Sequence, residues 1–174
     1  MKKLFTILLI IAINSTFYSQ VLKENKIDEF LKLEVKTTSW EQLTSKSARN
    51  LIYFRICKSD NNYFFDFKFI NRDVFSVSEN DVLMLKFDND NIYSLYCIKS
   101  STTTIGGGAI GFWGSQAYGI NVTYQSNQDK ELTLLSKHKV TKIRFYKSNG
   151  FVEEDIKPQY AQKIINAINL VNTH

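Results

Sequence analysis

Apolar and polar residues alternate along most of this chain, and the alternation is clearest in the segment 50–70. Two alternating runs joined by a short polar stretch are typical of a β-hairpin. Placing Phe54 opposite Phe67 gathers the apolar side chains of both runs on one face and sets Arg55 opposite Asp66 on the other. Core pairs and a charge pair therefore agree on one register, and a slip of one residue would turn the phenylalanines toward water.

A second hairpin is predicted at residues 82–100, around an Asn-Asp-Asn turn. We expect Phe87 to lie opposite Ile92, because this register makes one largely apolar face with Tyr96 on it. The same register places Cys97 on the less apolar face of the hairpin.

A third hairpin is predicted at residues 140–156, where an Asn-Gly pair is the strongest short turn signal. Its expected register sets Arg144 opposite Asp155. Strict alternation at 31–37 predicts a half-solvated strand with Lys36 on the solvated face. Shorter alternating runs predict further strands at residues 74–78 and 120–125.

Two segments have helical spacing. Ser126 is a suitable N-cap for a short helix that carries Leu132 and Leu135 on one face. Pro158 opens a C-terminal helix, whose apolar residues recur on one stripe. The stripe consists of Ala161, Ile164, Ile165, Ile168 and Val171. The fold class is therefore α+β: a mostly antiparallel rolled sheet or barrel of about eight to nine strands, with a short internal helix and a C-terminal helix that caps the sheet.

The first 19 residues have the pattern of a secretory signal peptide, because Lys2 and Lys3 precede a short apolar run that ends in small polar residues. The apolar run is too short to span a bilayer, which takes about 20 residues. We expect cleavage after Ser19, which leaves residues 20–174 as a single mainly-β domain. With no cysteine near the cleavage site there is no acceptor for a lipid anchor, so the expected location is periplasmic or extracellular, with no transmembrane segment in the mature chain.

Cleavage would lower the formal charge from +5 to +3, leaving 20 basic and 17 acidic residues. This small, scattered excess gives no reason to expect nucleic acid as a partner. Export favours a disulfide between Cys57 and Cys97, and two free buried thiols are the alternative. Two cysteines and a single internal histidine, His138, do not make a metal site, so no metal is expected.

No catalytic or cofactor-binding signature stands out. Residues 106–111 match G-x-G-x-x-G, but no helical period follows them and no βαβ unit surrounds them, so no nucleotide cofactor is expected. His138 lies between two lysines without a neighbouring Ser or Cys motif, which favours a solvent-exposed residue at a helix end over an acid–base role.

The segment 105–119 is the compositional exception in the chain. It has no charged residue, five glycines before Ser115, and the aromatic residues Phe112, Trp113 and Tyr118 outside any strand phase. We take these three aromatics as candidate binding residues, since aromatic side chains provide much of the contact area at recognition surfaces. Three roles stay open for the segment: ligand contact, membrane-interface contact, or a plug that completes the core.

The leader that ends in Ser19-Gln20 without a lipid-acceptor cysteine resembles those of exported proteins of the Bacteroidota. The order of the later elements, with a Thr141-Lys142-Ile143-Arg144 strand and an Asn-Gly turn before a terminal helix, is similar to small uncharacterised exported proteins of that group. This resemblance implies a structural type and carries no activity with it.

The function expected from the sequence is therefore that of an exported, non-enzymatic binding or structural domain, with contact through residues 105–119. An envelope protein, a glycan or a membrane surface are the partners left open. The alternative is a hydrolase or small-ligand carrier whose functional residues are dispersed over the sheet.

Overall fold

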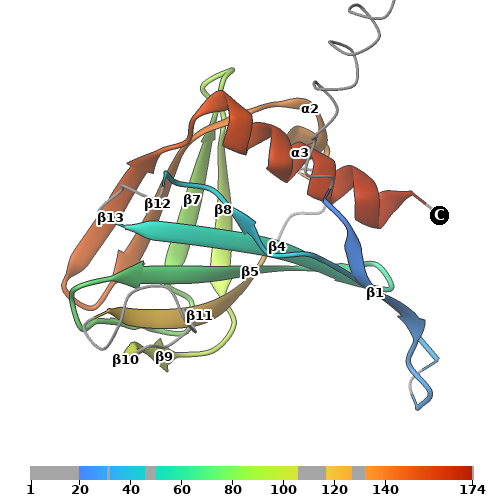
Figure 1. Ribbon diagram of the computed structural model, residues 1–174, viewed down its shortest axis with the longest axis horizontal. Coiled ribbons are helices and arrows are strands. Elements are labelled where there is room, and N and C mark those ends of the chain that lie inside the picture. The colour runs from blue at the N-terminus through green and yellow to red at the C-terminus, as the bar shows by residue number, and fades with distance from the viewer. Residues whose placement is uncertain (1–19, 31, 46–49, 106–116, 127–131, 174) are drawn as a thin grey trace, which may run out of the picture.

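The computed structural model describes residues 20–30, 32–45, 50–105, 117–126 and 132–173 of the 174-residue chain (Figure 1). The predicted signal peptide, residues 1–19, lies outside the described residues. The strands, in chain order, are β1 (Leu22–Ile27), β2 (Glu34–Thr38), β3 (Glu41–Gln42), β4 (Leu51–Ser59), β5 (Asn62–Asn71), β6 (Ser76–Val77), β7 (Val82–Phe87), β8 (Ile92–Cys97), β9 (Ser101–Thr102), β10 (Thr104–Ile105), β11 (Tyr118–Gln125), β12 (Val140–Lys147) and β13 (Gly150–Asp155). The helices are α2 (Leu132–Lys137) and α3 (Pro158–Asn172).

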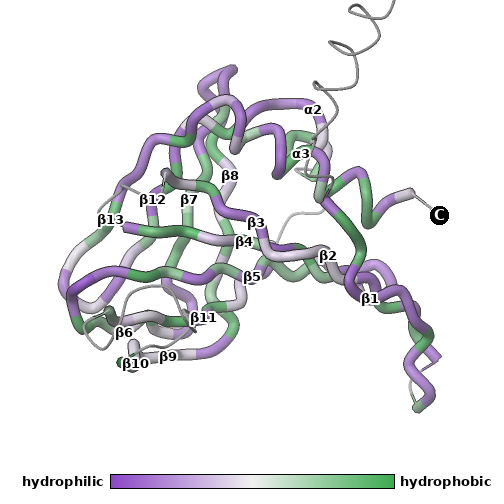
Figure 2. Tube along the Cα trace, viewed as in Figure 1, coloured by the Kyte–Doolittle hydropathy of each residue, from purple (hydrophilic) through white to green (hydrophobic). Residues whose placement is uncertain are grey.

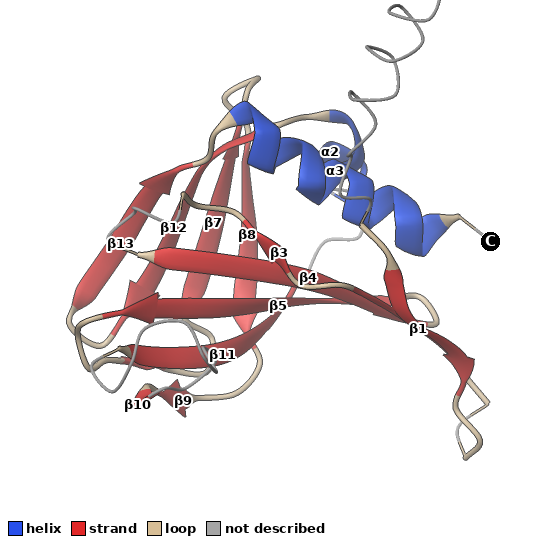
Figure 3. Ribbon diagram, in the orientation of Figure 1, coloured by secondary structure: helices blue, strands red, loops and turns tan. Residues whose placement is uncertain are grey.

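The strands form one large antiparallel sheet in the order β1-β2-β4-β5-β11-β8-β7-β12-β13, with β3 paired to β4 and β10 paired to β11. The remaining strands, β6 and β9, pair with each other in a separate two-stranded sheet. Figure 3 shows that the large sheet curls, so that β4, β5 and β11 cross in front of the upright β7, β8, β12 and β13, and α3 lies along one open side. The predicted α+β class with a mostly antiparallel sheet and a C-terminal helix is confirmed.

The sheet does not close into a barrel, so that part of the prediction is wrong. Its hydrogen-bonded order ends at β1 on one side and at β13 on the other. The β13 end approaches the start of β4, where the Nδ2 atom of Asn50 donates to Oε1 of Glu154 at 2.6 Å, a bond between side chains rather than between paired strands. The sheet has 11 strands rather than eight or nine, because two-residue strands and the polar β1 leave little alternation to detect.

The first predicted hairpin is confirmed residue by residue. Phe54 lies opposite Phe67 and Arg55 opposite Asp66 on β4 and β5. The two apolar rows of this hairpin are buried and join the main core. Figure 2 shows the alternation of hydropathy along β4 and β5. A two-residue turn at Asp60 and Asn61 links the strands, with Asp60 in the left-handed region at φ 53°.

The register predicted for the second hairpin is wrong by one residue. Lys86 rather than Phe87 lies opposite Ile92, because the loop has three residues and ends at Asp90 with φ 64°. A three-residue loop that ends in the left-handed region inserts a bulge and shifts the second strand. As a result Tyr93, Leu95 and Cys97 of β8 are buried in the core, while alternate residues of β8 point outward.

The third hairpin is also shifted, but by two residues, so its faces are as predicted. Arg144 lies opposite Glu153 instead of Asp155. The reason is that Ser148 and Asn149 form the turn, and Gly150 closes it at φ 118°, a conformation that suits glycine.

Helix α3 begins at Pro158 as predicted and contacts α2, β2, β4 and β12. Its buried residues are Ala161, Ile164, Ala167, Ile168 and Val171. Polar contacts connect the helix to the strands: Lys163 in its second turn pairs with Glu41 at 2.8 Å, and the Tyr63 hydroxyl donates to the side-chain oxygen of Asn172 at its end. The helix therefore covers the core on the side where the sheet is open.

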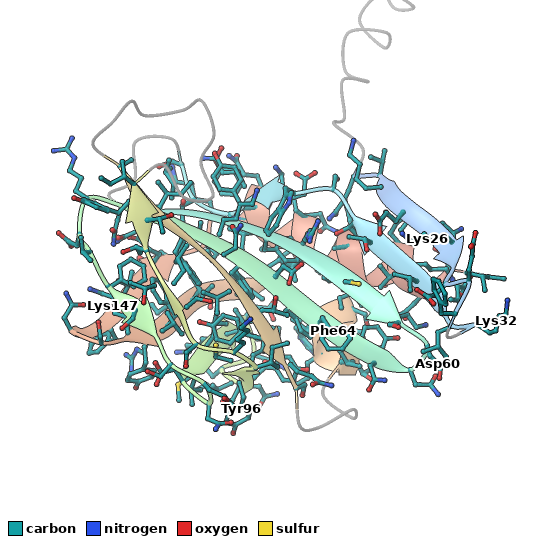
Figure 4. All side chains as sticks on the ribbon, turned by 90° about the horizontal axis from the view of Figure 1, so that it is seen from below. Lys26, Lys32, Asp60, Phe64, Tyr96 and Lys147 are labelled. Carbon is teal, nitrogen blue, oxygen red and sulfur yellow. The ribbon has the colours of Figure 1, made fainter. Side chains whose placement is uncertain are left out.

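The first two strands form an arm that extends beyond the rest of the sheet (Figure 1; Lys26 and Lys32 mark it in Figure 4). The strand β1 was not predicted, because its sequence LKENKI is polar, and five of its six residues are exposed. Phe30, in the turn of the arm, is 93% exposed. On β2 the predicted solvated position of Lys36 is wrong: its side chain is buried, with Nζ 3.0 Å from the Glu34 carboxylate.

Candidate binding surface on the outer face of the sheet

The antiparallel pairing of β4, β5 and β11 arranges their outward side chains in rows across the sheet. We call this surface the outer face, and Figure 4 shows it with Phe64 of β5 and Tyr96 of the neighbouring β8 labelled. Its three successive rows are Tyr53–Lys68–Asn121, Arg55–Asp66–Thr123 and Cys57–Phe64–Gln125. Because side chains alternate along a strand, these rows lie on the side opposite to the phenylalanine core.

Asp66 is the centre of the middle row. Its Oδ2 atom accepts from Nε of Arg55 at 2.8 Å, and its Oδ1 atom accepts from the Thr123 hydroxyl at 2.6 Å. The carboxylate is mostly buried, with 15% of the side chain exposed, while 36% of the Arg55 side chain is exposed. Both oxygens of Asp66 are thus engaged, and the guanidinium group is held in one orientation.

Trp40 lies in the connection between β2 and β3, at the β4 end of this row. Its ring is contacted by two cations: the Arg55 guanidinium carbon is 4.7 Å from the ring centroid, and Nζ of Lys68 is 4.2 Å from it. Both distances are within the range of attractive cation–π contacts, about 6 Å. One half-buried indole therefore positions two positive charges side by side.

The positive charge of this group exceeds its negative charge, since it has two cations, Arg55 and Lys68, and one carboxylate, Asp66, which pairs with Arg55. Burial lowers the pKa of Lys68, the neighbouring Arg55 lowers it further, and Asp66 only partly offsets the two. Within the described residues, the Lys68 ammonium group has no carboxylate at ion-pair distance and no hydrogen-bond acceptor. The arrangement leaves donors and positive charge available to a ligand.

Half-buried aromatic side chains lie on both sides of the charged row. Tyr53 is in the row beside Lys68, and burial raises its pKa. Phe64 is in the row on the other side, and Tyr96 on β8 lies beyond Gln125 in that same row. These rings provide apolar contact area on a surface that is otherwise polar.

The aromatic residues predicted to bind a ligand are not placed on this surface: Tyr118 is in the same strand phase as the core residues Ile120 and Val122, and the other two lie beyond the described residues. Phe112 and Trp113 lie outside the described residues, as does the whole segment 106–116. Tyr118 is half-buried in β11, where it pairs with Ile105 of β10 and with Asn71 of β5. The two ends of the segment 105–119 are thus adjacent.

The residue directly before Tyr118 lies at the edge of the outer face. Ala117 packs with Leu51 and Ile70 in a small apolar cluster, against which Tyr53 also packs. Tyr53 in turn shares a row with Lys68. The end of the predicted contact segment therefore adjoins the cationic group around Trp40.

The predicted disulfide between Cys57 and Cys97 is wrong, and both cysteines are free thiols. The strands that carry them, β4 and β8, are separated in the sheet by β5 and β11. The side chains also lie on different faces, because the shifted register of the second hairpin turns Cys97 into the core while Cys57 faces outward beside Thr37. The two intervening strands and the opposite orientation of the side chains together prevent a disulfide between Cys57 and Cys97.

The other polar side chains that the sequence raised as candidates make ordinary structural contacts. Nδ1 of His138 lies 3.2 Å from Oδ1 of Asp88, and both side chains are substantially exposed at the end of α2. In the part of the chain that the structure describes, no three residues of the types His, Cys, Asp and Glu come together as metal ligands would. The helices among these residues are all too short or too polar to cross a membrane.

Part of this surface could be predicted from the sequence. The register of the first hairpin correctly placed Arg55 beside Asp66, and Lys68 follows on the same face two residues later. Trp40 was missed as a partner because β3 has only two residues and shows no alternation. Alternation of side chains along the extended chain was the signal that could have placed it. Glu41 lies opposite the core-facing Phe54, so the preceding residue, Trp40, points to the same side as Arg55.

Comparison of the chain with protein-family models, curated proteins and solved structures found no match. The class of the protein is therefore defined by its own architecture: an α+β domain with a curled antiparallel sheet, a covering C-terminal helix and a cationic, aromatic outer face.

Proposed function

We propose that the mature chain, residues 20–174, is an exported, non-enzymatic binding domain of the cell envelope or the extracellular space, which contacts its ligand through the outer face around Trp40. The observation that carries this proposal is the pair of cations, Arg55 and Lys68, held on one indole ring beside a single carboxylate that pairs with Arg55. A partly desolvated lysine beside an arginine is unfavourable on its own. Such local conflicts concentrate at functional sites.

The alternative of a hydrolase has less support. Several of the shifted carboxyl and cation pKa values belong to surface ion pairs, as when Lys142 and Arg144 lower the pKa of Glu153. The buried groups with raised pKa values, Cys97 and Tyr124, lie in the core rather than in a cleft. These surroundings account for the shifts without a catalytic role.

Export rests on the leader pattern of residues 1–19. Intact-mass measurement of protein recovered from the periplasm or medium should give a chain that begins at Gln20, and an intact Met1 in exported material would contradict it. Exposure to the cell exterior is what makes an envelope ligand accessible to the outer face.

The binding role can be tested by sedimentation of the purified protein with envelope fragments from the producing cell. We expect wild-type protein to co-sediment, and Lys68→Gln and Arg55→Gln to lose most of this association. Lys139→Gln is a matched control, because Lys139 is an exposed lysine next to α2 and away from the outer face. Equal association of all four proteins would refute the proposed role of the outer face.

A further inference from the structure

We propose that Arg55 and Lys68 form an anion subsite that binds the carboxylate of an acidic saccharide, a glycan that carries uronic acid residues. This inference rests on the proposed binding function and names its ligand class. It combines three features of the outer face: unused donors, unbalanced positive charge, and flanking aromatic and amide side chains.

The first feature is the set of unused donors. A guanidinium group has five N–H donors and an ammonium group has three. Of these, Nε of Arg55 is bonded to Asp66, while the terminal nitrogens of Arg55 and Nζ of Lys68 have no acceptor among the residues described. Each oxygen of Asp66 already accepts one hydrogen bond, from Nε of Arg55 or from the Thr123 hydroxyl, and none of these remaining donors is bonded to it. A carboxylate from outside the chain has the two acceptor oxygens that such donors match.

The second feature is the local charge. Trp40 holds both cations within 4.7 Å of its ring centroid, although they repel each other and only Asp66 compensates them. Because the indole and Asp66 already fix Arg55 in place, the free guanidinium edge is preorganised, and little side-chain entropy is lost when an anion binds. A bound carboxylate would restore the charge balance of the group.

The third feature distinguishes a saccharide from other polyanions. The three rows contain two cations in all, side by side at Trp40, and apart from Asp66 the remaining side chains are neutral: Tyr53, Asn121, Cys57, Phe64, Thr123 and Gln125. DNA carries one charge per about 1.7 Å and needs a more continuous positive surface. A glycan with isolated carboxylates and many hydroxyl groups fits two cations flanked by amides.

The aromatic residues support the same ligand class. Tyr53 and Phe64 flank the charged row on its two sides, and neighbouring rows on a strand are about 7 Å apart. Half-buried aromatic rings are rigid apolar contact surfaces, which suit the apolar C–H face of a sugar ring, and Tyr53 adds a hydroxyl group. Asn121 and Gln125 are at the β11 end of the same rows, where their amides can bond to hydroxyl groups.

The test uses three polymers as probes for the protein that begins at Gln20. Polygalacturonate has sugar rings and carboxylates, its fully methyl-esterified form has the rings without the charge, and poly-L-glutamate has the charge without the rings. We expect polygalacturonate to bind, and the other two polymers to bind at least about tenfold more weakly by titration calorimetry. Lys68→Gln and Arg55→Gln should each weaken polygalacturonate binding about 10- to 100-fold, as expected for loss of charged hydrogen bonds, and Lys139→Gln should change it less than twofold.

Each contrary result overturns a defined part of the argument. Equal binding of the esterified polymer would overturn the anion subsite, and equal binding of poly-L-glutamate would overturn the saccharide as ligand class. If none of the polymers binds while envelope association still depends on Arg55 and Lys68, the saccharide inference fails and the binding function stands. If envelope association is indifferent to both residues, the two proposals fail together. The melting temperature of Lys68→Gln, expected close to that of wild type, confirms that a loss of binding is not a loss of folding.

Discussion

Cys97 on β8 and Tyr124 on β11 lie directly opposite each other, and both side chains are buried. This pair joins the two halves of the curled sheet at the short contact between β8 and β11, which extends over only two residue pairs. Burial raises the pKa of the Cys97 thiol and raises that of the Tyr124 hydroxyl well above 10. The backbone pairing that joins the two halves of the sheet therefore has a buried thiol and a buried hydroxyl beside it, and burial favours the neutral form of both.

We predict that Cys97 reacts with iodoacetamide much more slowly than Cys57 in the native protein. Thiolate is the reactive species, and the buried Cys97 has a raised pKa, whereas Cys57 is half-exposed on β4. Peptide mapping after timed alkylation gives both rates. Recovery of a disulfide-linked peptide containing both cysteines would show that the register of β8 described here is wrong.

Replacement of Tyr124 by Phe should leave the free energy of unfolding unchanged or raise it by up to about 1 kcal/mol. The hydroxyl is buried without a hydrogen-bond partner among the described residues, so its removal takes away a desolvation cost. Tyr63→Phe is the matched control, because the Tyr63 hydroxyl donates to Asn172 and its loss should cost about 1 kcal/mol. Urea denaturation of the two variants compares them directly, and an equal loss in both would mean that Tyr124 has a partner.

The two faces of the first hairpin should differ strongly in their contribution to stability. Phe67→Ala removes a fully buried ring and should cost about 3–5 kcal/mol. Arg55→Ala removes a partly exposed ion pair and should cost no more than about 1 kcal/mol. Chemical denaturation of both variants provides the comparison, and similar costs would mean that the outer face is packed like a core.

The lowered pKa of Lys68 predicts the pH dependence of stability on the alkaline side. In the native state Lys68 releases its proton at a lower pH than in the unfolded chain, where the ordinary pKa is near 10.5. The unfolded state therefore binds more protons in this interval, and stability increases with pH across it. The free energy of unfolding of wild type relative to Lys68→Met should rise as the pH approaches 10.5, and a difference that falls with pH would contradict the desolvation of Lys68.

Phe30→Ser should leave the melting temperature within about 1 °C of wild type. The Phe30 side chain is 93% exposed in the turn of the arm, and surface substitutions of this kind change stability little. Phe75→Ser, at a buried position, is the contrasting variant and should lower it by many degrees. Differential scanning calorimetry separates the two. A large effect at Phe30 would indicate that the arm packs against another part of the molecule.

The sequence predicted the fold correctly where the residue pattern of one hairpin determines its register, and incorrectly where the register depends on a turn conformation that the pattern does not specify. The register of β4 and β5 could be predicted because Phe54, Phe67 and the Arg55–Asp66 pair all require the same alignment. The register of β7 and β8 could not, because it depends on Asp90 adopting a positive φ, which the Asn-Asp-Asn turn does not specify by itself. A one-residue error there reversed the side of Cys97 and produced the incorrect disulfide.

The outer face shows a similar limit. Arg55, Asp66 and Lys68 could be assigned to one face from alternation alone. Trp40 contacts Arg55 and Lys68 from a position just before a strand of only two residues, which is too short to show alternation. Lys36 shows the reverse case, since its position in an alternating strand predicts exposure while the fold buries it beside Glu34. In both cases the outcome depends on packing between elements, β3 on β4 for Trp40 and α3 on β2 for Lys36, which alternation within one strand does not show.

The bond between Asn50 and Glu154 has a consequence for association between copies of the chain. The sheet ends at β13, whose outer edge has no strand partner within the described part of the chain, and such an edge is a template for growth by added strands. Here the edge carries consecutive acidic residues, Glu153 to Asp155, and one of them is turned back onto the start of β4. An approaching copy would have to bring its own acidic edge against this one and break that bond first. The side-chain bond that stands where strand pairing would close the sheet therefore also protects the β13 edge against edge-to-edge aggregation.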